Sequence, residues 1–138
     1  MSEQEIEELE KFLIQFVIER FSQKNARSVV NVLSSGIPGK KEEVFEFLSF
    51  LARAFIRCII NTKEYIYLKD ITSVVFAEAC MAKDLQPIYF IMSWSDSSAF
   101  YNPIPTMLSE IHRWLIYLEE NGKLPGKYER FTGKFVVI

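Results

Sequence analysis

The amino-acid sequence predicts a mainly α-helical protein, a compact bundle of about five to six helices followed by a short C-terminal β-hairpin. Apolar residues recur at helical spacing along most of the chain, and two short runs of β-forming residues flank a Thr-Gly turn near its end. The chain has 138 residues, of which 49% are hydrophobic and 25% charged. This size and composition are typical of one globular domain, so we expect residues 1–138 to form a single helical domain.

Two helices are predicted before the first clear break in the chain. From Glu3 to Phe21, apolar residues repeat with a helical period, and acidic residues in the first turns suit the positive end of the helix dipole. A shorter helix is predicted from Asn25 to Ser35. The two glycines and one proline within Ser34–Gly39 then end it.

The segment from Lys40 to Ile60 is predicted to form the central helix. Its polar residues are spaced by four, three, four and four positions, which places them in one narrow stripe along an otherwise apolar helix. These residues are Glu42, Glu46, Ser49, Arg53 and Arg57. Because only this stripe can face water, we expect the other elements to surround the helix on most sides.

The middle of the chain contains an ambiguous segment and two shorter helices. Tyr65–Leu68 has the composition of either a short strand or an extended connector. Asp70 is a suitable N-cap for a helix over Ile71–Lys83. Asp84, with Pro87 three residues later, indicates that another short helix begins there.

The last helix is predicted from about Thr106 to Asn121, where Asn121 and Gly122 form a strong C-terminal stop. After it, Tyr128–Phe131 and Lys134–Ile138 are typical of two short strands around a turn. We therefore predict a hairpin over about residues 127–138.

The charge and the apolar pattern of the sequence predict where the protein is located but do not identify its binding partner. The protein has a net charge of −2, so it lacks the overall positive potential of a protein that wraps nucleic acid. A local basic patch is still compatible with this charge. The N-terminus begins with acidic residues, and no apolar stretch reaches the roughly 18 residues that span a bilayer. We expect no membrane span and a cytoplasmic location.

The sequence contains no recognised catalytic, cofactor or metal motif. Cys58 and Cys80 lie in apolar helical sequence without zinc-ligand spacing, so we expect both to be buried as small apolar side chains. His112 is the single histidine, and no motif supplies it with a partner for acid–base catalysis, which favours a solvated or capping role. We therefore expect a protein that is not an enzyme and that carries no cofactor.

Glu78 is almost the only charged residue in its predicted helix. A buried carboxylate needs a cation or good hydrogen-bond donors, and Arg53 or Arg57 of the central helix is the natural candidate for a buried ion pair. An exposed position at the helix edge is the alternative. A functional acid with a raised pKa is a third possibility, because perturbed carboxylates cluster at functional sites.

Two sets of apolar residues are candidates for contact with a partner protein. The serine-rich loop Ser93–Ser98 is either a solvated connector or a binding loop with aromatic anchors. The apolar C-terminal strand must be buried in its own fold or against a neighbour. The candidate contact residues are Trp94, Phe100, Tyr101, Phe135 and Val137.

A set of basic residues is a candidate for contact with nucleic acid: Arg27, Lys40, Lys41, Lys123, Lys127, Arg130 and Lys134. The last four alternate with Tyr128, Phe131 and Phe135 on and beside the predicted hairpin. A helix followed by such a hairpin could touch a phosphate backbone and stack on bases, as a wing does. Lysines on an exposed edge strand also protect against aggregation, which is the alternative.

Three functional hypotheses follow, in decreasing order of support. The first is a non-enzymatic helical subunit that contacts protein, either as a homo-oligomer or within a larger complex, because the chain is rich in apolar residues for its length. The second is a small helical subunit of a nucleoprotein assembly that uses the basic residues. The third is a small-molecule-binding or catalytic domain around Glu78 and the Ser93–Ser98 loop.

Overall fold

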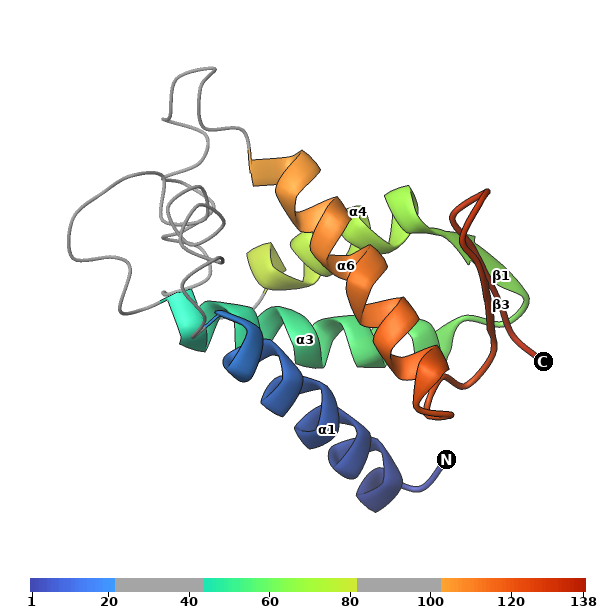
Figure 1. The fold of residues 1–138 in the computed structure, drawn as a ribbon, viewed down its shortest axis with the longest axis horizontal. Helices are drawn as coiled ribbons and strands as arrows, with labels where there is room; N and C mark the ends of the chain where they lie inside the picture. The colour runs from blue at the N-terminus through green and yellow to red at the C-terminus, as the bar shows by residue number, and fades with distance from the viewer. Residues whose placement is uncertain (22–43, 82–102) are drawn as a thin grey trace.

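The computed structural model describes residues 1–21, 44–81 and 103–138 (Figure 1). Within these ranges it contains four helices and one three-stranded antiparallel sheet, so the prediction of a mainly helical protein is confirmed. The helices are α1 (Glu3–Phe21), α3 (Val44–Asn61), α4 (Leu68–Met81) and α6 (Pro103–Glu120), and the strands are β1 (Tyr65–Tyr67), β2 (Lys127–Glu129) and β3 (Lys134–Val136). The helices predicted over Asn25–Ser35 and from Asp84 lie outside the described residues.

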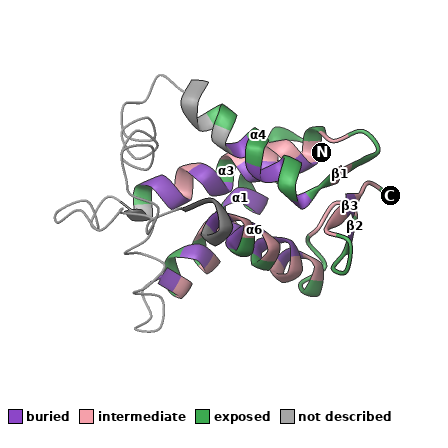
Figure 2. Ribbon diagram, turned by 90° about the horizontal axis from the view of Figure 1, so that it is seen from above, coloured by how far each residue is buried: buried purple, intermediate pink, exposed green. Residues whose placement is uncertain are grey.

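Helix α3 lies between α1 and α4 and contacts both (Figure 1). Its buried side chains are Phe47, Leu48, Leu51, Ala52, Phe55, Ile56 and Ile59. On the predicted polar stripe, Glu46 and Arg53 are exposed. In Figure 2 the buried residues of the helices gather in one interior, with exposed residues around it. The central helix predicted from residue spacing is therefore confirmed from Val44 onward.

Helix α6 contributes Trp114, the largest fully buried side chain among the residues that the structure describes. The Trp114 ring lies edge-on to that of Phe55, with the ring centroids 5.6 Å apart. Such aromatic pairs contribute about 0.5–1.5 kcal/mol beyond their burial. The helix ends where the sequence predicts, because Gly122 adopts a φ of 65° and the Lys123 N–H donates to the Leu118 carbonyl at 2.8 Å.

Two arginines attach α1 to the other helices through ion pairs with three glutamates. Arg20 of α1 donates two hydrogen bonds to Glu110 of α6, at 2.7 and 2.9 Å. Arg57 of α3 reaches Glu3 and Glu10 of α1, at 2.7 and 2.9 Å. Glu10 and Glu110 are both buried, so their carboxylates depend on these guanidinium partners.

The predicted hairpin is part of a larger sheet with the strand order β1-β3-β2. The segment Tyr65–Tyr67, for which the sequence left a strand and a connector open, is a strand that pairs antiparallel with β3. The register places Ile66, Phe135 and Tyr128 side by side, and Phe135 and Tyr128 are buried in the core. The sequence left open that the lysines of the hairpin lie on an exposed edge strand. Because β3 is the middle strand and β2 is an edge strand, this is wrong for Lys134 and correct for Lys127.

Two helix starts differ from the prediction. Helix α4 begins at Leu68 rather than Ile71, so Asp70 lies in the first turn and not at the N-cap. The reason is that β1 continues directly into the helix, and the Leu68 N–H donates to the Gly133 carbonyl at 2.7 Å in place of a side-chain cap. Helix α6 begins at Pro103, whose fixed φ and missing N–H suit the first turn of a helix.

The connection between α6 and β2 is closely packed at Gly126. A Cβ atom at this position would collide with the Val136 carbonyl oxygen and would lie 2.7 Å from a ring carbon of Phe135. Only glycine allows the backbone to approach the sheet this closely.

The Arg20–Glu110 pair provides a test of how α1 is held. Arg20→Ala removes both close hydrogen bonds to the buried Glu110 carboxylate and leaves it with the more distant Arg113 Nε at 3.8 Å, so we expect a loss of about 3 kcal/mol in the free energy of unfolding, measured with urea. Replacing both residues with methionine should cost less, because no charge then remains buried. Glu3→Ala breaks a pair whose carboxylate side chain is 64% exposed and should cost less than about 1 kcal/mol. Equal losses for Arg20→Ala and Glu3→Ala would contradict this account.

Candidate functional site

The turn of the hairpin lies where two helices and the sheet meet. A cavity of about 490 Å³ at this place is lined by Tyr67, Leu68, Lys69 and Asp70 from β1 and α4, by Leu108 from α6, and by Thr132 and Gly133 from the turn. The start of α4, the N-terminal half of α6 and the hairpin turn are therefore neighbours on one side of the molecule.

The hairpin turn is held in place by backbone and side-chain hydrogen bonds. Gly133 adopts a φ of 73°, which favours glycine, and its N–H donates to the Glu129 carbonyl at 2.9 Å. The Thr132 hydroxyl donates to the Glu129 carboxylate at 3.2 Å. The Gly133 carbonyl accepts the bond from Leu68 described above, so the turn is fastened both to itself and to α4.

The outer face of the sheet carries aromatic and basic side chains. Because side chains alternate along a strand, the residues next to buried Tyr128 and Phe135 point away from the core. These are Tyr65 and Tyr67 on β1, Lys134 and Val136 on β3, and Lys127 and Glu129 on β2. Tyr65 is 51% exposed, and the Lys134 ammonium lies 4.5 Å from its ring centroid.

The structure places three of the four C-terminal basic residues on the sheet or its turn and the fourth, Lys123, against α1. Lys127 is exposed on β2, Lys134 is half-buried on β3, and Lys123 lies over the Phe12 ring at 5.6 Å. Arg130 is exposed and lies 3.3 Å from Glu120 and 3.7 Å from Glu119, so its charge is partly neutralised. Arg27, Lys40 and Lys41 lie outside the described residues.

Of the five candidate partner-contact residues the structure describes two, and neither is exposed. Phe135 is fully buried in the chain's own core, and Val137 is half-buried, with its N–H donating to the Glu64 carbonyl at 2.9 Å. Trp94, Phe100 and Tyr101 lie outside the described residues.

Sequence reasoning named Phe131 as a candidate for base stacking but missed the two exposed tyrosines of β1. Tyr67 is 42% exposed beside Tyr65, and Phe131, which the sequence placed at the end of a strand, is fully exposed in the turn. The alternation of Tyr65, Ile66 and Tyr67 was the available signal, because a half-buried strand alternates in this way.

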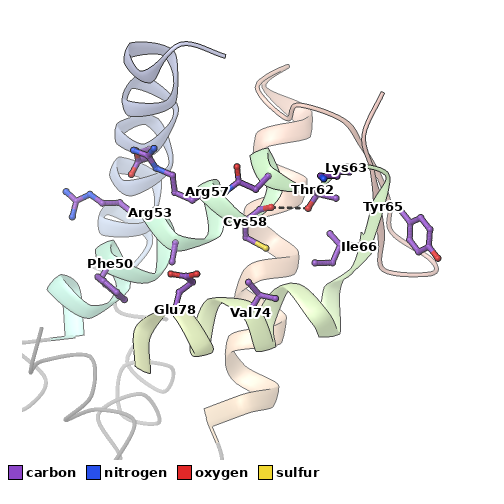
Figure 3. A pocket seen from close by; sticks show the side chains of 13 residues that line it. Phe50, Arg53, Arg57, Cys58, Thr62, Lys63, Tyr65, Ile66, Val74 and Glu78 are labelled. Carbon is purple, nitrogen blue, oxygen red and sulfur yellow. Dashed lines mark hydrogen bonds and ion pairs between the residues drawn. The ribbon is translucent and has the colours of Figure 1, made fainter. Parts of the chain in front are cut away.

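A groove of about 1050 Å³ lies between α3, α4 and β1 (Figure 3). Glu78 of α4 lies across this groove from Arg53 and Arg57 of α3 (Figure 3). Glu78 is exposed and has no ion pair among the described residues, whereas Arg57 pairs with Glu3 and Glu10. The structure therefore brings the three residues to one groove without forming the predicted buried ion pair.

Cys58 lies in this groove and is half-buried. Burial raises the pKa of the Cys58 thiol to about 11, and the negative charge of Glu78 acts in the same direction. Thiolate is the reactive form of cysteine, so Cys58 is unsuited to nucleophilic chemistry near neutral pH.

His112 is half-buried and bonded rather than solvated. Its Nδ1 atom lies 2.6 Å from the Tyr128 hydroxyl, which links α6 to β2. Burial raises the pKa of Tyr128, so this hydroxyl stays protonated near neutral pH. The contact is suited to holding the sheet against α6.

Comparisons with protein-family models, curated proteins and solved structures find no match. Within residues 1–21, 44–81 and 103–138, no three His, Cys, Asp or Glu side chains are grouped so that they could hold a metal ion. None of the helices in the same ranges combines the length and apolarity that crossing a membrane requires.

The pKa of Cys58 gives a direct test of its environment. In a Cys80→Ser background, alkylation of Cys58 at pH 8 should be about 100-fold slower than that of an unperturbed thiol, because a shift from 9.0 to about 11 removes most of the thiolate. The rate should continue to rise up to about pH 11. A rate that reaches its plateau near pH 9 would contradict this description of the groove.

Proposed function

We propose that this protein binds nucleic acid through the outer face of its sheet, the hairpin turn and the adjoining ends of α4 and α6. The observation that carries the proposal is the clustering of aromatic and basic side chains on one small sheet, the exposed Tyr65, Tyr67 and Lys127 and the half-buried Lys134. Cations attract the phosphate backbone, and aromatic faces stack on bases.

The positions of the two lysines support contact with neighbouring phosphates. Lys127 is opposite Val136, and Lys134 is two residues from Val136 on the same face, so the two lysines are diagonal neighbours. Such neighbours are about 7–8 Å apart. One strand of a duplex carries roughly two phosphates over that distance.

The arrangement of the turn also supports the proposal. A hairpin that directly follows α6 in the chain, with its turn beside the N-terminal half of that helix, can contact a backbone while the helix approaches a groove. The start of α4 adds Lys69 to the same side.

Oligonucleotide binding tests the proposal. Fluorescence anisotropy with labelled duplex and single strands should show binding at low salt that weakens steeply as salt rises. Lys127→Ala and Lys134→Ala should each lower the slope of log affinity against log salt by about 1. Lys11→Ala, an exposed lysine on α1, is the matched control and should change neither affinity nor slope.

An absence of binding at low salt would refute the proposal for this chain. If Lys11→Ala and Lys127→Ala changed the affinity equally, the nucleic acid would not bind specifically at the sheet. Thermal melting of each variant should match the wild type, because Lys127 is exposed and the contact of Lys134 with Tyr65 is worth only about 0.5–1 kcal/mol.

The groove between α3 and α4 supports a second candidate function, contact with a protein. Its lining includes the apolar residues Phe50, Ala54, Ile66 and Val74, and Val74 is 39% exposed. An apolar groove with charged residues at its rim is typical of a surface that receives a partner helix or a second copy. This candidate retains the hypothesis of a non-enzymatic interaction subunit.

Substitution within the groove tests the second candidate. If the chain self-associates through this surface, Val74→Glu should reduce the mass measured by light scattering to that of a monomer, because the new charge would be buried on association. Ser73→Glu introduces the same charge at the neighbouring exposed position outside the groove lining and should leave the mass unchanged. A wild-type monomer at every concentration would remove the self-association form of this candidate.

A further inference from the structure

Phe131 is the most exposed large apolar side chain of the described residues, at 105% of its reference area. Single exposed apolar residues are common on protein surfaces, so exposure alone assigns no role. The place of Phe131 is distinctive because it lies in the hairpin turn, between β2 and β3. At this position the side chain is presented beyond the sheet.

The backbone that carries Phe131 is fixed in several places. The Gly133 N–H and the Thr132 hydroxyl both bond to Glu129, which closes the turn around Phe131. The Leu68 N–H holds the Gly133 carbonyl at 2.7 Å. Inserting a side chain carried on an ordered backbone costs less ordering entropy than inserting one carried on a mobile loop.

The neighbours of Phe131 suit a nucleic-acid surface. Arg130 precedes it, and Thr132 follows it, so a cation and a hydroxyl flank the apolar ring. The Arg130 guanidinium lies against Glu119 and Glu120 of α6, which holds it near the end of the helix. The turn therefore carries a cation beside the exposed ring, with part of its charge offset by these carboxylates.

We propose that Phe131 inserts as an apolar wedge between adjacent base pairs of a duplex and unstacks them. The proposal rests on the proposed nucleic-acid binding and specifies duplex DNA as the ligand. Exposed Phe, Leu, Ile and Met side chains that enter a base step unstack it and bend the duplex. Pyrimidine–purine steps are the easiest to unstack, so the wedge favours a TA step.

The test uses duplexes in which 2-aminopurine lies next to a central TA step, because its fluorescence rises when it is unstacked. Saturating wild-type protein should raise the fluorescence, and an otherwise equal duplex with a central A-tract should give a smaller rise. Phe131→Ala should abolish the rise at saturation and weaken binding by about 5- to 150-fold, the range for loss of one base–aromatic contact. Phe131→Leu should retain part of the rise.

Lys127→Ala is the matched control, since it should weaken binding but keep the full rise at saturation. Phe131→Ala should melt at the wild-type temperature, because the side chain is fully exposed. A wild type that binds duplex without a rise, or a rise that survives in Phe131→Ala, would overturn the wedge and leave the proposed function standing. A wild type that binds no duplex would overturn both. Loss of self-association in Phe131→Ala, with an unchanged fluorescence rise, would assign the ring to protein contact instead.

Discussion

The pairing of β1 with β3 is the constraint on which the rest of this structure depends. Three-residue strands form no stable hairpin by themselves, because they bury too little surface and close too few hydrogen bonds. Adding β1 gives β3 a partner on both sides and anchors the end of the chain to the connection between α3 and α4. The bonds from Leu68 to Gly133 and from Val137 to Glu64 extend this pairing beyond both ends of β1. The position of the hairpin turn beside α4 and α6 follows directly from it.

Apolar packing stabilises the helical core, and ion pairs fix the position of α1 on it. Helix α3 is apolar around most of its circumference and supplies a large share of the buried core. Apolar contact is non-directional, so it does not by itself fix how far α1 slides along α3. The pairs of Arg20 with Glu110 and of Arg57 with Glu10 are directional, and they lie at the C-terminal end and near the middle of α1. Together they set both the position and the rotation of that helix.

The sequence predicts the helices well because each carries a long periodic pattern of its own. Helix α1 begins and ends where the spacing of Ile6, Leu9, Leu13 and Val17 indicates, and the stop at Gly122 is a local signal. Strand β1 could not be predicted with the same certainty, because Tyr65–Tyr67 becomes a strand only by pairing with β3, which lies near the other end of the chain. The start of α4 was misplaced for the same reason, since its cap is the distant Gly133 carbonyl and not Asp70.

The close fit at Gly126 divides the hairpin into two parts with different freedom to change. At its base, the Val136 carbonyl and the Phe135 ring already fill the space of any added side chain. At its apex, the Phe131 side chain is fully exposed. Replacement of Phe131 by another residue can therefore be accommodated without repacking the interior, so evolution or a protein engineer can alter the apex while the scaffold below it stays the same.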